Sequence, residues 1–484
     1  MAGRDGGAGW MFRTIKIDPV TRIEGHARIL LDCNEAGLVE DAFFCVNELR
    51  GFERILVGME AHTMPQVTAR ICGVCPTAHH LVAAKALDSA AGVTPPEAGK
   101  LLREFMYMGH VIHSHALSLF ILAGPDLVFG LRGEAAARNI VGMADEEPEL
   151  TKKGLRLRSL GQKINETIGG RGIHPVTAVA GGISFSLSDG QFSRLQELTA
   201  EAVSLCAGMV GTVRDLLFHF FDDNRKLLES QNLSSWYLGN VSDGKLDFYS
   251  GVLRAMDENG AVRKEFKVDQ YDQWLVERAV TYSYAKEVYL LHENRENMYR
   301  VGTLARLNVI DGIETPLAQV EFEKFRNSFG WPCHNSVIQM YAKLIELIYA
   351  CERADELINN PTLRGRTRVP APFTGGRGVA HIEAPRGTLI HDYEIDERGI
   401  IRKANMIIAT QQNTAAINTS LKESGGSLLT GENDEEVLNS LEFVVRCYDP
   451  CLACSTHAIG RMPLEVEIRL NNHVIRRIRR RHDA

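Results

Sequence analysis

The sequence lacks the features that mark membrane, exported and nucleic-acid-binding proteins. No uninterrupted apolar run approaches the roughly 18 residues that cross a bilayer, so we expect no transmembrane segment. Residues 1–10 contain no apolar stretch of the signal-peptide type, and we interpret them as the flexible N-terminal tail of a cytoplasmic protein. The formal net charge of −7 argues against nucleic acid as a partner.

Cysteine is also scarce. Ten cysteines in 484 residues are too few for a disulfide scaffold. Four of them nevertheless form two C-x-x-C pairs, Cys72 with Cys75 and Cys451 with Cys454, a spacing that indicates metal binding or redox chemistry in a reducing compartment. The other six have no partner spacing and are expected to be buried thiols: Cys33, Cys45, Cys206, Cys333, Cys351 and Cys447.

Two further absences limit what the chain does alone. Beyond the two pairs there is no cysteine-rich motif of the kind that holds an iron-sulfur relay, so electrons would have to leave through a partner. The glycine-rich stretch 169–182 contains no G-x-G-x-x-G that follows a strand, so we predict no nucleotide site there.

Hydrophobic patterning predicts an α+β fold that is mostly helical. Apolar residues recur at three- and four-residue spacing through 98–128, 192–221 and 337–358, as in the long helices of a bundle core. Alternating patterns between Thr14 and Arg50, and again around a turn at 397–399, predict small antiparallel β regions. Because we find no internal repeat and no low-complexity linker, we predict a single domain over residues 11–457.

Four thiolates together would form a soft, strongly donating site suited to zinc, an iron-sulfur cluster or nickel. Spacing alone does not choose between a structural zinc site and a redox metal. A dithiol switch and plain buried thiols are the weaker alternatives. The two pairs lie at opposite ends of the predicted domain, so folding must bring them together if they act as one site.

The neighbours of the pairs favour catalysis over a structural site. His79 and His457 follow the two pairs, Arg22, Glu24 and His26 lie in an RIEGH stretch, and Arg386 lies in an EAPRG stretch. A closed zinc site needs neither an acid nor an arginine. Heterolytic cleavage of H₂ needs a Lewis-acidic metal, a base for the proton and a relay out of a dry pocket.

Five sequence blocks together resemble one known family. RIEGH, NELRGFE, RICGVC, EAPRG and DPCLACSTH resemble the signature blocks of nickel-iron hydrogenase large subunits, in the family's order. The stretches 113–130 and 169–182 further resemble its cytoplasmic group 3 branch, which is linked to soluble cofactors or a heterodisulfide. The resemblance implies the large-subunit fold and a single catalytic domain over 11–457 that reversibly cleaves H₂ to protons and electrons.

The resemblance also implies a nickel-iron centre. Cys72 and Cys451 would be terminal nickel ligands, and Cys75 and Cys454 would bridge nickel to an iron that carries CO and cyanide. Glu24 resembles the family's proton-transfer carboxylate, although an ordinary paired glutamate is the plainer alternative. The other implied members are Arg386 over the open bridging position, Asp449 as its anchor, Pro385 and Thr410 around the diatomic ligands, and His79 beside a cysteine sulfur. A structural salt bridge is the plainer alternative for Arg386.

A second metal is implied at some distance from this centre. Glu48 and His457 match the family's remote magnesium or iron site, with the Ala409 carbonyl as a third ligand. The lone histidines His113, His115 and His174 fall on apolar stretches and are expected to have ordinary partners in the core or at an interface.

The implied partners follow from the same resemblance. They are an iron-sulfur small subunit, further electron-transfer subunits linked to NAD, flavin or a heterodisulfide, nickel-insertion proteins and a maturation protease. The protease would remove the C-terminal extension, residues 458–484, after His457. Within it, EVEIRL and VIRRIR flank Asn471-Asn472 and predict a hairpin, which we expect to hold the Cys451 segment open until the metals are loaded.

Two other functions compete with catalysis. One is an H₂ sensor with the same site and little turnover, and the other is an electron-transfer or scaffold relative with the same fold. Scaffold relatives lose the cysteine pairs, so the retained pairs favour the enzyme.

Overall fold

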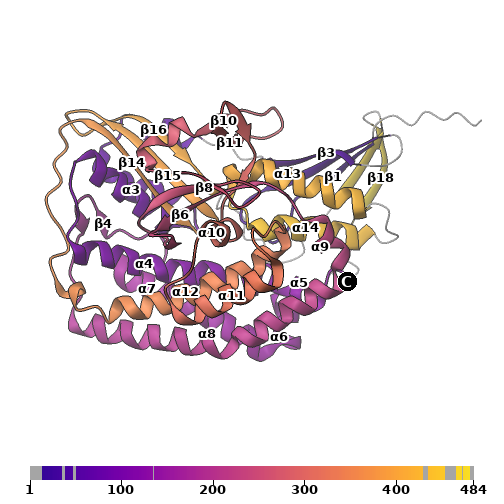
Figure 1. Ribbon diagram of the computed structural model, residues 1–484, viewed down its shortest axis with the longest axis horizontal. Helices are drawn as coiled ribbons and strands as arrows, with labels where there is room; N and C mark the ends of the chain where they lie inside the picture. The colour runs from indigo at the N-terminus through magenta and orange to yellow at the C-terminus, as the bar shows by residue number, and fades with distance from the viewer. Residues whose placement is uncertain are drawn as a thin grey trace, which may run out of the picture.

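The structure is a computed structural model that describes residues 13–34, 39–46, 51–134, 136–428, 434–452, 465–470 and 473–479. Most of the long helices gather along one side of the molecule, and small antiparallel sheets lie along the other (Figure 1). The predicted α+β class is therefore confirmed.

Long helices that pack against one another form the bundle. They are α4 (Glu97–Ala116), α7 (Pro148–Gly169), α8 (Asp189–Asp223) and α12 (Gln339–Ile358). Helix α4 contacts α7 and α12, and α8 contacts the same two helices (Figure 1). The predicted helical stretches correspond to α4, α8 and α12, whereas α7 was missed because lysines and arginines interrupt its apolar pattern.

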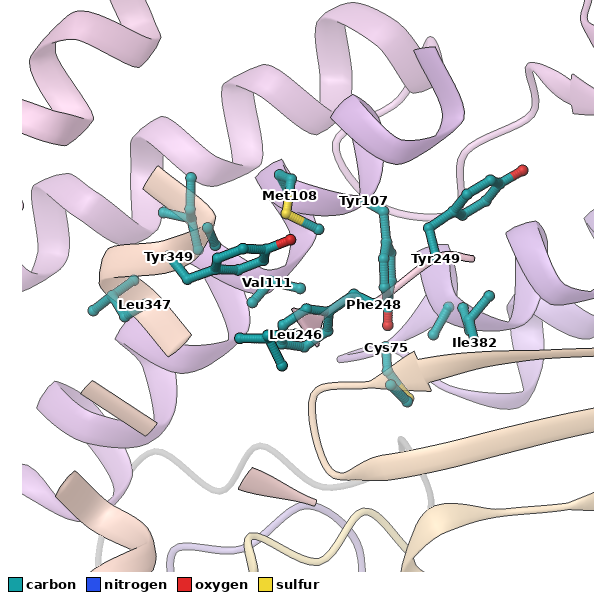
Figure 2. Packing of buried hydrophobic residues seen from close by; sticks show 14 of the residues in the cluster. Cys75, Tyr107, Met108, Val111, Leu246, Phe248, Tyr249, Leu347, Tyr349 and Ile382 are labelled. Carbon is teal, nitrogen blue, oxygen red and sulfur yellow. The ribbon is translucent and has the colours of Figure 1, made fainter. Parts of the chain in front are cut away.

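Local sequence signals explain where these helices begin and end. Helix α8 begins at a capping box, in which the Gln191 N–H donates to Ser188 Oγ and the Ser188 N–H donates to Gln191 Oε1. Helix α4 is followed without a break by a π-helical segment, η3 (Leu117–Leu122), which leads into α5 (Gly124–Phe129). The core between α4 and α12 is filled by aromatic and aliphatic side chains, among them Tyr107 and Tyr349 (Figure 2).

One five-stranded sheet joins the two ends of the chain. Its order is β18-β17-β1-β2-β3. Its strands are β1 (Arg13–Asp18), β2 (Ala27–Cys33), β3 (Val39–Val46), β17 (Glu465–Leu470) and β18 (His473–Arg479). The hairpin predicted in the C-terminal extension is confirmed, because β17 and β18 are antiparallel neighbours. Strand β17 pairs in turn with β1, from Glu465 opposite Asp18 to Leu470 opposite Arg13.

A second sheet precedes the last helices. Strands β14 (Gly376–Ala384), β15 (Gly387–Ile395) and β16 (Ile401–Ile407) are consecutive and antiparallel. The predicted turn at 397–399 joins β15 to β16, and β14 is an additional strand. Helices α13 (Ala409–Leu428) and α14 (Asp434–Tyr448) then lead to the second cysteine pair.

The strands between 236 and 300 were not predicted. They are short, and β9 exposes four of its five residues, so the apolar alternation that marks a half-buried strand is weak here. These strands are β6 (Trp236–Ser242), β7 (Lys245–Leu246), β8 (Val252–Met256), β9 (Val262–Phe266), β10 (Leu275–Arg278), β11 (Glu287–His292), β12 (Arg295–Asn297) and β13 (Tyr299–Arg300).

The remaining elements are short helices and one small hairpin, apart from the longer helices α3 and α11. They are α1 (Phe52–Leu56), η1 (Ala61–Thr63), α2 (Met64–Thr68), η2 (Ala69–Ile71), α3 (Pro76–Ala90), α6 (Ile140–Glu146), β4 (Ala178–Val179), β5 (Gly182–Ile183), α9 (Arg225–Ser230), η4 (Val268–Gln273), α10 (Thr303–Val309), α11 (Pro316–Phe329), η5 (Ser336–Ile338) and η6 (Pro361–Arg364).

Within the described chain, two helical stretches are long and apolar enough to cross a membrane by length and composition alone. They are Glu97–Phe129 and Asp189–Asp223. In the most apolar window of the first, 72% of the residues are buried inside the protein, compared with 28% in the second. Core helices of proteins that do not enter membranes pass the same test, so these helices alone are weak evidence for a membrane span.

Two glycines allow α4 and α7 to touch. A Cβ on Gly161 of α7 would lie 2.5 Å from the Gly109 carbonyl oxygen and 2.5 Å from the His113 backbone nitrogen. A Cβ on Gly109 of α4 would meet Ile164 at 2.7 Å. Because real Cβ atoms do not come this close to other atoms, the two helices can pack at this distance only without side chains there.

The substitution Gly161→Ala should therefore destabilise the protein by about 1–3 kcal/mol, since the helices must move apart. Gly208→Ala in α8 is the matched control, because nothing lies within 4 Å of its added Cβ. The control should raise stability by about 0.5–1 kcal/mol, since alanine favours the helix. Thermal unfolding measures both, and a Gly161→Ala protein as stable as the wild type would contradict the close contact.

Candidate metal centre

The first cysteine pair lies at the start of a helix. Cys72 follows η2 with an extended backbone, and Cys75 directly precedes α3. Pro76 suits the first helical position because its missing N–H is not needed there. The turn brings the Cys75 N–H to Cys72 Sγ, with an N···S distance of 3.1 Å. A helix N-terminus also favours negative charge, so this location favours thiolates.

Cys451, the first residue of the second pair, is held by the RIEGH block and by Thr410. Asp449 follows α14 with a φ of 51°, a left-handed conformation that Asp tolerates better than most residues, and the chain turns there. Cys451 then pairs in parallel with Glu24 as an isolated β-bridge. The Leu452 N–H donates to the Glu24 carbonyl oxygen at 2.9 Å, and the Cys451 N–H donates to Thr410 Oγ1 at 3.0 Å.

Three thiols from distant parts of the sequence meet in the interior. Cys451 Sγ lies 3.0 Å from Cys72 Sγ and 3.7 Å from Cys75 Sγ. Both distances exceed the roughly 2.05 Å of a disulfide, and none of the three cysteines forms one. Among the residues that the structure describes, they are the one group of metal-ligand side chains at this spacing. Cys454 lies outside the described residues.

Crowding opposes the ionisation of these thiols. The pKa of Cys75 is raised well above its usual value, first by the hydrogen bond with the Cys451 thiol. The pKa of Cys451 is raised in the same way, first by the hydrogen bond with Cys72. Like charges this close cannot all form without a compensating cation. A metal ion supplies that charge, and the thiolate donors fit zinc or nickel.

Arg386 is placed beside the thiols by a tight turn. It occupies the two-residue connection between β14 and β15, where Ala384 pairs with Gly387. Gly387 has a φ of 134°, and a Cβ there would meet Val301 at 2.4 Å, so the turn needs glycine. Arg386 Nε donates to the Asp449 carbonyl oxygen at 2.6 Å, and Nη2 donates to Asp449 Oδ1 at 3.1 Å.

The third nitrogen of this guanidinium has a different environment. Arg386 Nη1 is buried with no hydrogen-bond partner in the described part of the chain. A buried donor without an acceptor is costly, at about 1–3 kcal/mol. The arrangement therefore fits a hydrogen-bond acceptor that belongs in the cavity and is not part of the described protein.

Asp449 is itself held from the other side. Lys343 Nζ lies 3.2 Å from Asp449 Oδ2 and donates to Ser118 Oγ at 2.6 Å. Burial raises the pKa of Asp449, but Arg386 and Lys343 outweigh burial and leave this pKa below its usual value. The carboxylate stays charged and fixes the arginine. Lys343 was not predicted, although it is a lone lysine in the apolar stretch 340–350.

A second buried network anchors the RIEGH block. Arg22 has a φ of 54° and donates to Asp126 Oδ1 at 2.5 Å. Arg138 and Arg446 donate to the same carboxylate, each at 2.9 Å. Burial raises the pKa of Asp126, but the three arginines keep it below its usual value. Asp126 was also missed, since a single Asp beside a proline reads as a turn residue.

Glu24 and His79 lie near the thiols, because Glu24 is bridged to Cys451 and His79 lines the same cavity as the sulfurs. Both carboxylate oxygens of Glu24 are buried, and neither has a hydrogen-bond partner among the residues described. The charge of Glu24 acts on Cys451, to which its backbone is bridged. His79 lies one turn into α3 from Cys75, and its Nδ1 is 3.1 Å from His391 Nε2.

The thiols line a mostly apolar cavity of about 70 Å³. Apolar walls come from Val46, Ile71, Leu389 and Ile408. The structure brings the following predicted residues to this cavity: Cys72, Cys75, Cys451, His79, Arg386, Pro385, Ala409 and Thr410. Two other predicted residues, Glu48 and His457, lie outside the described residues.

The three lone histidines have hydrogen-bond partners in the protein, and the other six cysteines are buried. His115 Nε2 contacts Glu346 Oε2 at 2.9 Å, His113 Nδ1 contacts the Arg158 carbonyl oxygen at 3.3 Å, and His174 Nδ1 contacts the Ala69 carbonyl oxygen at 3.1 Å. The six other cysteines are buried thiols outside any disulfide, as predicted: Cys33, Cys45, Cys206, Cys333, Cys351 and Cys447.

Family models match most of this sequence. A model described as nickel-dependent hydrogenase matches residues 50–139 and 178–457, which is more than half of the chain. The chain belongs to the nickel-dependent hydrogenase family. A second model, described as HoxL-like, matches residues 14–49 of this hydrogenase. The matched ranges contain both cysteine pairs, Glu24 and Arg386.

Known relatives lie in the branch predicted from the sequence. This hydrogenase is 37% identical to a subunit of the F420-non-reducing hydrogenase vhc of Methanococcus voltae, over 93% of this chain and 96% of that one. It is 35% identical to the beta subunit of the NAD-reducing hydrogenase HoxS of Cupriavidus necator, over 95% of this chain and 97% of that one.

A solved structure agrees with these relatives. The NAD⁺-reducing NiFe hydrogenase in the H₂-reduced state superposes with a TM-score of 0.86 at 36% identity, over 92% of this chain and 99% of that chain. The predicted family, large-subunit fold and enzyme class are therefore confirmed.

Nickel binding to the metal-free chain should depend on pH. Because the pKa values of Cys75 and Cys451 are raised, protons must leave these thiols when the metal binds, and affinity should rise between about pH 6 and 8. Cys451→Ser should weaken binding by about tenfold or more. Cys333→Ser, which alters a buried thiol elsewhere, should bind normally. Competition with a chelating dye measures the nickel affinity of the wild type and of both variants. A pH-independent affinity of the wild type would contradict nickel binding by these thiols.

Proposed function

We propose that this chain cleaves H₂ heterolytically at a nickel-iron centre held by Cys72, Cys75, Cys451 and Cys454. The observation that carries the proposal is the meeting of three of these thiols with Glu24 and Arg386. Both carboxylate oxygens of Glu24 and the Nη1 of Arg386 are buried without a partner among the described residues. A closed structural metal site has no use for an acid and an arginine with unsatisfied groups. A site that separates a proton from H₂ needs both.

The four cysteines have different positions in the proposed centre. Cys72 and Cys451 would be terminal ligands of nickel, and Cys75 and Cys454 would be ligands of both nickel and an iron that carries CO and cyanide. When bound, the centre supplies Lewis acidity and redox capacity for the cleavage of H₂. The apolar walls of the cavity exclude water, so charged side chains act there at low dielectric.

Glu24 is the proposed proton acceptor. Its backbone is bridged to Cys451, and its carboxylate has both oxygens available inside the protein. A carboxylate in this position takes up a proton beside the sulfur and passes it outward.

Arg386 and its neighbours complete the proposed machinery. Arg386 directs Nη1 to an acceptor in the cavity, while Asp449 and Lys343 fix its orientation. Thr410 Oγ1 accepts from the Cys451 N–H, so its own hydroxyl proton is left to donate to a diatomic ligand. Pro385 lines the cavity beside it.

We assign a remote magnesium or iron site to Glu48, His457 and the Ala409 carbonyl. Ala409 is buried at the start of α13, directly before Thr410. That position supports a second metal close to the end of the mature chain, where it would tie His457 to α13.

The electrons of the reaction require partners. Among the described residues, the thiol cluster is the one group with metal-ligand spacing, so this chain offers no relay of its own there. The acceptor that we propose is an iron-sulfur small subunit, with further electron-transfer subunits linked to NAD, flavin or a heterodisulfide, in the cytoplasm. The relatives support a heteromeric complex, because each is named as one subunit of its hydrogenase.

Maturation is the last part of the proposal. We propose that nickel-insertion proteins load the site and that a protease then removes residues 458–484, which leaves 11–457 as the catalytic domain. The expectation that the extension holds Cys451 away from the other thiols does not fit the structure. Cys451 Sγ already lies 3.0 Å from Cys72 Sγ while β17 is paired with β1.

The described residues on either side of the proposed cleavage point are both bonded to the N-terminal region. Residues 453–464 connect Leu452, which is bonded to Glu24, to β17, which is bonded to β1. Both ends of this connection are therefore attached to the same N-terminal region, and cleavage would release one of them.

Glu24→Gln should lower H₂-dependent dye reduction by at least about 100-fold, because glutamine keeps the size of the side chain but cannot accept a proton. Nickel content and the infrared bands of CO and cyanide should be unchanged. Glu265→Gln, which alters an exposed pair with Arg254, is the control.

Three results would argue against this assignment. Wild-type turnover in Glu24→Gln would remove its role. A wild type with full metal content and infrared bands but almost no turnover would favour the H₂ sensor. Zinc without nickel would favour a structural site.

Active, nickel-loaded enzyme should end at His457. Intact-mass measurement of protein made with and without nickel tests this, since only the nickel-free preparation should retain residues 458–484. An active preparation that keeps the extension would rule out the proposed cleavage.

A further inference from the structure

A buried chain of polar side chains leads away from the thiol cavity. His79 lines the cavity, and its Nδ1 lies 3.1 Å from His391 Nε2. The other nitrogen of His391, Nδ1, lies 2.6 Å from the Tyr393 hydroxyl oxygen. His391 and Tyr393 are two residues apart on β15 and so share a face of the strand. His79, His391 and Tyr393 are all buried, with at most 2% of each residue exposed.

Each contact in this chain needs one donor and one acceptor. A neutral imidazole has one N–H and one bare nitrogen, so the direction of one hydrogen bond fixes the next. A phenol hydroxyl is a far better donor than a neutral imidazole N–H, and an imidazole nitrogen is the better acceptor. Burial also raises the pKa of Tyr393, which keeps its hydroxyl protonated.

The Tyr393 hydroxyl also hydrogen-bonds with Thr68, whose own proton goes to the Met64 carbonyl oxygen at 2.8 Å. An imidazole nitrogen is a stronger acceptor than the Thr68 hydroxyl oxygen. These preferences orient the hydrogen bonds between the three side chains. Tyr393 donates to His391 Nδ1, so His391 carries its proton on Nε2. His391 therefore donates to His79 Nδ1, and His79 carries its own proton on Nε2, the nitrogen that His391 does not engage.

We infer that His391 and Tyr393 set the tautomer of His79, so that its Nε2 is protonated and acts as a hydrogen-bond donor. Both act through His79 and are positioning residues. The consequence for catalysis rests on the proposed function: a donor beside a thiolate withdraws charge from the sulfur and tunes the bound metals.

The opposite orientation would have the opposite effect. If His79 donated toward β15, its Nε2 would be bare and would repel a thiolate. The His79–His391 and His391–Tyr393 distances are the same in both cases, so the Tyr393 hydroxyl decides between them. Helix α3 packs directly on β14 and β15, which keeps the three side chains in register.

The first experiment reads the tautomer without any metal. Nitrogen-15 NMR of the metal-free, histidine-labelled chain distinguishes protonated from bare ring nitrogens. The wild type should show His79 protonated on Nε2, and Tyr393→Phe should show a mixture of both tautomers. Tyr299→Phe is the control, because this buried hydroxyl donates to Gln412 at 3.0 Å and to none of the three linked side chains. It should leave the His79 signals unchanged.

The second experiment uses the loaded enzyme and two variants at one position. His391→Gln keeps an amide N–H that can donate to His79 Nδ1, whereas His391→Leu does not. His391→Leu and Tyr393→Phe should move the infrared bands of CO and cyanide to lower wavenumber and lower turnover by about tenfold. His391→Gln should restore both toward the wild type.

The outcomes separate this inference from the proposed function. An unchanged His79 tautomer in metal-free Tyr393→Phe overturns the inference, whatever happens to turnover. Equal infrared bands in His391→Leu and His391→Gln overturn its consequence for the metals. Absence of CO and cyanide bands from the wild type overturns the proposed function, and the tautomer measurement still decides the inference.

Discussion

Crowded sulfur atoms in a dry interior are the constraint on which the rest of this site depends. Cys451 Sγ lies within hydrogen-bond distance of both Cys72 Sγ and Cys75 Sγ, and this crowding raises the pKa of Cys75 and Cys451. Such a group is stable as thiolates only beside positive charge. Burial alone would lower the pKa of Arg386, but Asp449 and the thiols outweigh it, so the arginine remains charged beside them.

Two buried carboxylates hold distant segments of the chain around that group. Asp449 joins the β14–β15 turn to α12 through Arg386 and Lys343. Asp126 joins the RIEGH block to α14 through Arg22 and Arg446. Removing one partner from such a network leaves buried charges uncompensated, at a cost of roughly 3–5 kcal/mol. The same charges that place the functional groups therefore also fix the fold near the site.

The sequence predicted the parts of this structure that repeat a pattern or a motif. Long helices such as α8 and the strands β1 to β3 follow from apolar periodicity, and the two cysteine pairs from their spacing. The motifs also identified Arg386 and its anchor Asp449, but not the lysine that holds Asp449 from the other side. Lys343, Asp126, His391 and Tyr393 belong to no motif, and their importance appears only when folding places them against charged or hydrogen-bonding groups. Among the strands between 236 and 300, β9 was missed because four of its five residues are exposed, and β6 because its five consecutive buried residues show no alternation.

The pairing of β17 with β1 has a consequence for synthesis of the protein. Arg13 and Leu470 are neighbours in one sheet although they lie near opposite ends of the chain. Contacts over such a separation form late, because a very long loop must close first. During translation, before β17 has been made, the edge of β1 that pairs with β17 is exposed. Unpaired strand edges can pair with strands of other chains and so promote aggregation. Translation rate and chaperone protection of residues 13–18 should therefore govern how much of the newly made protein escapes aggregation.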